Sequence, residues 1–344
     1  MKKFIATLCS QRVQRKEIEL TTLKSILLKP IGHAVGDSIV HLMHIMQIKN
    51  AFPQAKIGVF VTERNRAIYE NADIVDELIE DHFSGYLSQR GKWELYLDFF
   101  PSFTTKSIIL DAILKPKYVI NFGKRDKKHY NLATVKNYDY AVEVPELTHF
   151  KEYLMYSPLA SYLSPVVNYH LKISNEAKEK VTNFWKNTNT VKILLNPQGS
   201  TRFLPAEELT SLLENVKYAH VEYLMTNTAG SEAYFAKLPQ LDNLHLAPKT
   251  SLFEYFTLID SADIVVAVDG GGVHIACACG KPLLAFYSNN EQTLHKWAPS
   301  PKEKVNCLTL IGKHEASDNN GTTGFNMTKA AEWLNDEILN ITEQ

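Results

Sequence analysis

The chain has 344 residues, a length that suits two domains of roughly 150–170 residues each. Hydrophobic residues make up 45% of it and charged residues 22%, which excludes a disordered or fibrous protein. The formal net charge is −1, so the overall charge gives no reason to expect a nucleic-acid partner, and we expect none.

The first half of the chain alternates strand-like and helical patterns. Apolar runs of strand length occupy residues 25–28, 56–61, 74–79, 95–98 and 118–121. Between the first two runs, residues 38–50 repeat apolar side chains at the spacing of one helix face. This alternation is typical of βαβ units around a parallel sheet. Residues 1–22 precede the first strand and form an N-terminal extension.

The alternation weakens over residues 130–167, where Tyr, Pro and Ser cluster, and this segment is predicted to be a surface connection between domains. Strand patterns resume at 191–196, 220–225, 264–268 and 282–287, and helical patterns at 205–215, 252–261 and 328–341. We therefore predict an α/β protein with a first domain at residues 23–170 and a second at residues 171–325. A last helix, within residues 326–344, is expected to pack back on the first domain.

A glycine-rich turn is the strongest motif of the sequence. The apolar run 264–268 ends at Asp269, and three glycines (270–272) follow before a helical pattern begins. Glycines leave backbone N–H groups open to a ligand, and a helix N-terminus adds unpaired donors with a partial positive charge. Three glycines exceed what a tight turn needs, so we interpret this loop as a cradle for a diphosphate. Asp269 would orient it through backbone N–H groups, while His274 either faces the ligand or is buried.

A second candidate phosphate loop follows the strand pattern at 191–196. Its residues are Gln198, Gly199, Ser200, Thr201 and Arg202. The two hydroxyls can donate to phosphate oxygens, and the guanidinium of Arg202 can clamp them bidentately. The alternative is that Ser200 or Thr201 caps the next helix and Arg202 is solvated. Asn227, after the strand pattern at 220–225, either borders a nucleotide or belongs to a capped turn.

Two features of the first half also carry chemistry. Residues 29–38 join the first strand to the first helix, and Asp37 lies where that helix starts. Asp37 is either a helix cap or a general base. The basic run at residues 124–129 is either a solvated charge run or a contact for an anionic ligand.

The order of these motifs resembles the ADP-heptose:lipopolysaccharide heptosyltransferases of glycosyltransferase family 9. The matching segments are Gly36-Asp37, the small polar loop that ends in Arg202, and the loop from Asp269 to His274, within roughly residues 25–288. Gly270 departs from the pattern, because the family commonly has Thr there and one hydroxyl donor is lost. The loop at residues 29–36 is also slightly longer than usual.

The resemblance implies the GT-B architecture, with two Rossmann-like parallel-sheet domains that face each other across a cleft. It implies inverting transfer of heptose from ADP-heptose to the lipopolysaccharide core, without cofactor or metal, with Asp37 as the catalytic base. We expect the donor to contact Gln198, Gly199, Ser200, Thr201, Arg202, Asn227, Asp269, Gly270, Gly271, Gly272 and His274. We expect the acceptor to contact Gly32, His33, Lys124 and Arg125.

The expected partners are a nucleotide sugar and a lipid-linked anionic saccharide. We expect a cytoplasmic protein that works peripherally at the inner membrane, since no apolar run is long enough to span a bilayer and the apolar start is too short for a secretion signal. Cations that would attract anionic lipid are Lys2, Lys3, Arg12, Arg15 and Lys16. Cys277, Cys279 and His274 lack a fourth ligand with metal-binding spacing.

Three alternative functions stay open on the same architecture. The first is a transferase that uses another nucleotide sugar, and the second is a nucleotide-sugar epimerase, which needs no acceptor. The third is a two-lobed binding protein that holds a nucleotide sugar without releasing the nucleotide.

Overall fold

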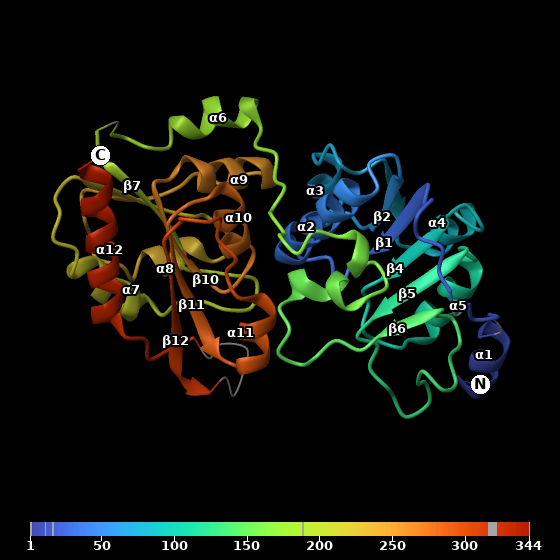
Figure 1. Ribbon diagram of the computed structural model, residues 1–344. Helices are drawn as coiled ribbons and strands as arrows, with labels where there is room; N and C mark the ends of the chain where they lie inside the picture. Colours follow the sequence, from blue (N-terminus) through green and yellow to red (C-terminus); the bar gives the residue numbers. More distant parts are fainter. Residues whose placement is uncertain (1, 11, 16, 188, 316–321, 344) are drawn as a thin grey trace. The chain divides into compact units, whose positions relative to one another are not determined.

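The computed structural model describes residues 2–10, 12–15, 17–187, 189–315 and 322–343 (Figure 1). The chain divides into two compact units, Met1–His170 and Leu171–Gln344. The first unit ends at His170, the residue predicted to end the first domain. Each unit is built on a six-stranded parallel sheet that carries helices.

The first sheet has the strand order β3-β2-β1-β4-β5-β6, and all its pairings are parallel. Its strands are β1 (Ser25–Lys29), β2 (Lys56–Val61), β3 (Glu77–Glu80), β4 (Leu95–Asp98), β5 (Tyr118–Phe122) and β6 (Tyr140–Val142). The central strands are buried along their length, as expected for apolar runs in a parallel sheet covered on both faces.

Helices and 3-10 turns complete the first unit: α1 (Lys2–Cys9), α2 (Val35–Ala51), α3 (Arg66–Glu70), α4 (Phe83–Ser88), α5 (Thr105–Leu114), η1 (Phe150–Tyr156) and η2 (Ala160–Tyr162). The segment at 130–167 is not the surface connection that its composition predicts. It supplies β6, and η1 packs against α2 with Phe150 and Leu154 buried. These apolar side chains hold the segment on the unit although its own pattern is weak.

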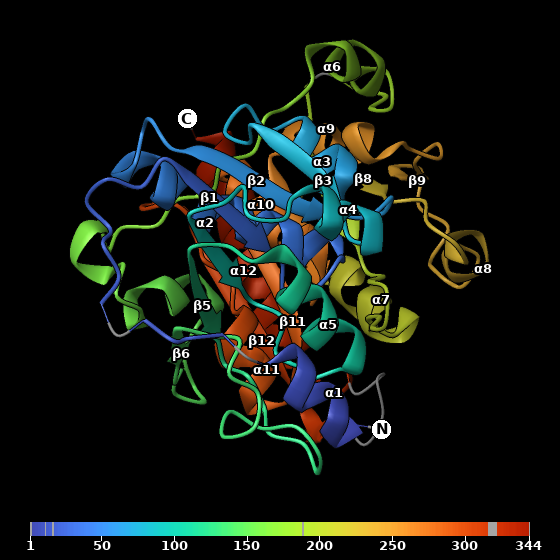
Figure 2. The ribbon, with the colours of Figure 1, turned by 90° about the vertical axis from the view of Figure 1, so that its right-hand side faces the viewer.

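The N-terminal extension is part of the first unit. Helix α1 packs against α5 (Figure 2). Arg12 binds the carboxylate of Asp139, so it serves the fold of this unit rather than the lipid contact expected for it. Arg15 is exposed, whereas Lys16 lies outside the described residues. None of the helices that the structure describes combines the length and apolar character needed to cross a membrane.

The second sheet repeats the topology of the first, with the strand order β12-β11-β10-β7-β8-β9. Its strands are β7 (Val191–Asn196), β8 (Val221–Met225), β9 (Leu244–Leu246), β10 (Ile264–Val268), β11 (Leu283–Asn289) and β12 (Cys307–Glu315). Taken in chain order within each unit, both sheets read 3-2-1-4-5-6, the arrangement of dinucleotide-binding folds.

The helices of the second unit are α6 (Asn175–Thr182), α7 (Ala206–Glu214), α8 (Ser231–Phe235), α9 (Leu252–Ser261), α10 (Gly271–Cys279), α11 (Glu291–Trp297) and α12 (Met327–Thr342). The last helix, within residues 326–344, which is expected to pack back on the first domain, is part of the second unit. Helix α12 lies beside α7, and its stripe of Ala330, Leu334 and Ile338 belongs to the core of the second unit (Figure 1). Residues four apart share one helix face, so this stripe is buried as one surface.

Candidate active site

The candidate loops lie where each sheet reverses its strand order. In the second sheet the order reverses between β7 and β10, and ligands of such sheets bind in the crevice at the carboxyl ends of these two strands. The loops at residues 197–205 and 269–270 leave these two ends. In the first sheet the reversal lies between β1 and β4, and the loop at residues 30–34 follows β1.

The glycines between β10 and α10 have different structural roles. A Cβ atom on Gly272 would lie 2.0 Å from Asn196 Nδ2 and 2.8 Å from Tyr255 Oη, so any other residue here forces these side chains to shift. A Cβ atom on Gly270 would have its nearest neighbours 3.7 Å away, which is ordinary contact. Gly270 is the N-cap of α10 and no side chain caps this helix, so the first-turn N–H groups have no side-chain partner there.

The loop between β7 and α7 is folded on itself. The N–H of Gly199 donates to the carbonyl oxygen of Arg202 at 2.7 Å, which leaves Ser200 and Thr201 exposed at its tip. Helix α7 has Pro205 as its N-cap and no side-chain cap, so the alternative that Ser200 or Thr201 caps it is wrong. The loop is linked to the start of α8, because Ser231 Oγ donates a hydrogen bond to Gln198 Oε1 at 2.7 Å.

The two loops meet in an ion pair. Arg202 Nε donates to a carboxylate oxygen of Asp269 at 2.8 Å, so Asp269 binds a guanidinium rather than the backbone N–H groups expected for it. Burial raises the pKa of Asp269 to about 6, and Arg202 acts in the opposite direction. Of the three side-chain nitrogens of Arg202, only Nε forms a hydrogen bond with another of the described residues. The two terminal nitrogens of this side chain remain available to an anion.

A polar group beneath these loops was not predicted from the sequence. Asn196 ends β7, and its Oδ1 accepts from Thr226 Oγ1 at 2.9 Å while its Nδ2 donates to Tyr255 Oη at 3.0 Å. A usable signal was present, because Asn196 is a polar residue that ends an otherwise apolar run. Such a residue lies at the carboxyl edge of a parallel sheet, where ligands bind.

Two further residues expected to contact the donor, His274 and Asn227, contact other parts of the second unit. His274 is buried in α10 and packs edge-on against Trp297, with ring centroids 6.1 Å apart. Asn227 Nδ2 donates to the carbonyl oxygen of Ala247 at 2.9 Å and so links the ends of β8 and β9. In the part of the chain that the structure describes, no three His, Cys, Asp or Glu side chains gather to hold a metal ion.

Asp37 lies in the first turn of α2 and does not cap it. The N-cap is Ala34, so the capping alternative for Asp37 is wrong. A Cβ atom on Gly32 would lie 2.1 Å from Asp37 Oδ2, which places the carboxylate directly against this glycine. The half-buried Asp37 thus sits in the first turn of a 17-residue helix, next to its uncapped N-terminus.

His33, in the loop that follows β1, lies beside an ion pair between Lys29 and Asp81. Its Nε2 lies 3.5 Å from Asp81, and Lys29 Nζ lies 3.2 Å from the other oxygen of that carboxylate. Lys29 also donates to Tyr86 Oη at 2.5 Å. Burial lowers the pKa of His33 below its ordinary value, which outweighs the opposing effect of Asp81, so the imidazole is neutral at pH 7.

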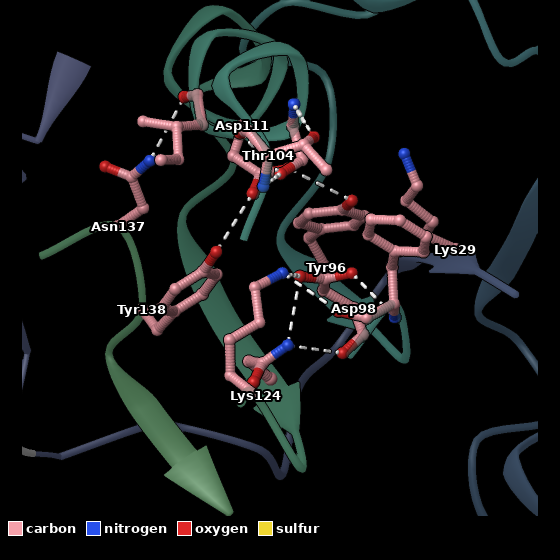
Figure 3. A network of polar contacts seen from close by, with 12 residues as sticks. Lys29, Tyr96, Asp98, Thr104, Asp111, Lys124, Asn137 and Tyr138 are labelled. Carbon is pink, nitrogen blue, oxygen red and sulfur yellow. Dashed lines mark hydrogen bonds and ion pairs between the residues drawn. The ribbon is translucent and has the colours of Figure 1, made fainter. Parts of the chain in front are cut away.

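Lys124 is buried, so its expected contact with the acceptor is wrong. Its side chain is 0% exposed, and Nζ lies 2.8 Å from a carboxylate oxygen of Asp98, which is 1% exposed (Figure 3). Nζ also donates to the carbonyl oxygen of Phe100 at 2.9 Å. A buried carboxylate needs a compensating charge, and Lys124 supplies it for Asp98. The next residue, Arg125, is exposed.

The motif loops and the sheet topology together point to one enzyme family. A sequence model of glycosyltransferase family 9 (heptosyltransferase) matches residues 106–323, more than half of the chain. This chain belongs to glycosyltransferase family 9. The family resemblance and the α/β fold with two Rossmann-like parallel sheets, both expected from the sequence, are confirmed.

Similar proteins of this glycosyltransferase include two of known structure. It is 24% identical over 323 residues to an Escherichia coli K12 protein named provisionally as lipopolysaccharide heptosyltransferase 4, covering 89% of this chain and 87% of that protein. A family 9 glycosyltransferase of Veillonella parvula DSM 2008 matches with a TM-score of 0.76 and 14% identity, over 94% of this chain and 100% of that one. Escherichia coli ADP-heptose lipopolysaccharide heptosyltransferase II matches with a TM-score of 0.71 and 16% identity, over 93% and 100%. The two structures share the GT-B fold with this chain.

A pocket of about 410 Å³ lies beside the loops that follow β4 and β5 of the glycosyltransferase. It is lined by Phe103, Thr104, Thr105, Lys127, Lys128, His129 and Tyr130. Of the basic run at residues 124–129, Lys127, Lys128 and His129 therefore line a cavity, whereas Lys124 is turned into the core.

Replacing Gly272 by alanine is expected to destabilise the second unit by about 1–3 kcal/mol, because the added methyl group forces Asn196 and Tyr255 apart. Gly270→Ala is the matched control, since a methyl group there meets only ordinary contacts, and its stability should stay within about 0.5 kcal/mol of wild type. Urea unfolding of both variants measures the difference. Equal midpoints would show that Gly272 is not needed for close packing.

Proposed function

We propose that this glycosyltransferase moves heptose, with inversion, from ADP-heptose to an anionic, lipid-linked saccharide of the lipopolysaccharide core, at the cytoplasmic face of the inner membrane. The observation that carries the proposal is the meeting of Arg202 with the Asp269–Gly272 loop at the reversal point of the second sheet. A guanidinium and a helix N-terminus are both suited to diphosphate oxygens. The identity of the sugar rests on the name of the Escherichia coli relative that uses ADP-heptose.

The donor half of the proposal places the diphosphate between the Gln198–Arg202 loop and the first turn of α10. Negative charge grows on the diphosphate as the bond to the anomeric carbon breaks. The N–H groups of α10 and the terminal nitrogens of Arg202 stabilise that charge in place of a metal ion. Preorganised donors of this kind contribute most where water is excluded.

The acceptor half of the proposal uses Asp37 as the general base. Asp37 takes the proton of an acceptor hydroxyl, and the oxygen forms its new bond to the anomeric carbon on the face opposite the departing diphosphate. Gly32 leaves room for the carboxylate, and His33 stands in the same loop. An anionic group of the acceptor enters the cavity lined by Lys127, Lys128 and His129.

Charge reversal in this cavity should act on the acceptor alone. Lys128→Glu is expected to raise KM for an anionic acceptor by about tenfold or more, the equivalent of one charge-assisted hydrogen bond, and to leave KM for the donor unchanged. Lys92→Glu, at an exposed lysine elsewhere on the first unit, is the control. Initial rates with varied acceptor measure the effect. An unchanged acceptor KM would remove the cavity from the acceptor site.

The decisive experiment measures nucleotide release from a panel of nucleotide sugars, with and without a lipopolysaccharide-core acceptor. We expect ADP to be released from ADP-heptose only when the acceptor is present. Release from a different nucleotide sugar would change the donor assignment. Conversion of the sugar without acceptor would indicate an epimerase, and binding without release would indicate a non-catalytic protein.

A further inference from the structure

Tyr255 lies beside the proposed donor loops and is not among the residues assigned to the donor above. Tyr255 lies one turn into α9, whose start is fixed by a capping box between Ser251 and Glu254. Its half-buried side chain reaches the end of β7, where Tyr255 Oη accepts a hydrogen bond from Asn196 Nδ2 at 3.0 Å. The hydroxyl therefore occupies a defined position at the carboxyl edge of the second sheet.

The proton of this hydroxyl is still available. Oη accepts from Asn196, so its own proton must point to another atom. Asn196 does not accept it, because the amide faces Tyr255 with the donor Nδ2, and the hydrogen bond of Oδ1 comes from Thr226. Within the described residues of the second unit, no acceptor takes the Tyr255 proton. Burial raises the pKa of Tyr255 above its ordinary value, so the phenol stays protonated at physiological pH.

The hydroxyl lies against the helix turn that we assign to the diphosphate. A Cβ atom on Gly272 would be 2.8 Å from Tyr255 Oη. With a Cα–Cβ bond of about 1.5 Å, Oη is at most about 4.3 Å from the Cα atom of Gly272. Gly272 belongs to the uncapped first turn of α10, and Gly270 before it offers no hydroxyl.

We propose that Tyr255 donates its hydroxyl proton to an oxygen of the donor's diphosphate and thereby supplies the side-chain hydroxyl that Gly270 lacks. Tyr255 is then a further donor-binding residue, oriented by Asn196 and Thr226. The inference rests on the proposed function, because it requires a nucleoside diphosphate at this loop. It adds a neutral donor to the charged one that Arg202 provides.

The test is calorimetric titration of the full chain with ADP and with adenosine, which lacks phosphate. Tyr255→Phe removes only the hydroxyl and is expected to weaken ADP binding about tenfold or more, the equivalent of a hydrogen bond to a charged group, while adenosine binding is unchanged. Tyr223→Phe is the matched control, since that hydroxyl is buried in the same unit without a hydrogen-bond partner. Adding Gly270→Thr to Tyr255→Phe should restore part of the ADP affinity, because position 270 has room for a side chain.

The possible results separate this inference from the proposed function. Wild-type ADP affinity in Tyr255→Phe would overturn the role of Tyr255 and leave the transferase proposal intact. An equal loss for ADP and adenosine would also overturn it, because the hydroxyl would then support the fold rather than the diphosphate. If the wild-type chain binds no nucleoside diphosphate, both proposals fail.

Discussion

Asparagine in place of Asp37 is expected to lower turnover at least about 100-fold while ADP affinity stays at the wild-type value. Asparagine has the same shape as aspartate and keeps its packing against Gly32, but it cannot take a proton from the acceptor hydroxyl. The donor loops belong to the second unit, and the substitution changes none of their residues. Steady-state rates with saturating substrates, together with ADP titration, measure the two quantities.

A second variant tests the role of Asp37 by displacing its carboxylate. Gly32→Ala leaves Asp37 in the chain but would place a methyl group 2.1 Å from its carboxylate oxygen, so the carboxylate must move. This variant should also lose turnover while it binds ADP normally. Asp73→Asn, at a side chain 61% exposed on the same unit, should keep the wild-type rate. Full activity of Asp37→Asn would show that another group is the base.

The strands were predictable from the sequence because parallel sheets bury both faces of their central strands. A run such as Ile264–Val268 is apolar at every position, which is typical of a strand buried on both faces of a parallel sheet. The edge strands β6, β9 and β12 were not predicted. For the three-residue β6, its pairing with β5 rather than its own pattern makes it a strand. The placement of α12 was also missed, because an apolar stripe shows that a helix packs but not on which surface.

The site was predictable in its loops and not in its side-chain pairs. Consecutive glycines after a strand pattern indicate a turn with exposed backbone N–H groups, and this predicted the loop at residues 269–272. The pairing of Lys124 with Asp98 depends on the register of β4 and β5, which sets Asp98 opposite Asn121. That register is a property of the folded sheet and cannot be seen in the sequence. The basic run at residues 124–129 therefore gave no sign that Lys124 is buried.

Removal of the Lys124 side chain is expected to destabilise the first unit by about 3–5 kcal/mol, the usual cost of leaving a buried charge without its partner. In Lys124→Ala the carboxylate of Asp98 keeps its contact with Asn121 Nδ2 at 3.0 Å but has no cation. Urea unfolding at pH 7 measures the loss. Lys127→Ala, in the exposed part of the same run, should stay within about 0.5 kcal/mol of wild type.

The pH dependence of this loss separates a missing charge from a mere cavity. Burial raises the pKa of Asp111 in the folded protein, the nearby Asp98 carboxylate raises it further, and Lys124 lowers it. A carboxyl whose folded pKa exceeds its unfolded value binds more protons when folded, so its contribution to stability falls as pH rises through that interval. Without Lys124 the interval extends upward, and the deficit of Lys124→Ala should be larger at pH 8 than at pH 5. Asp98→Asn in the same background should recover most of it at pH 8, whereas an equal deficit at both pH values would mean that only packing was lost.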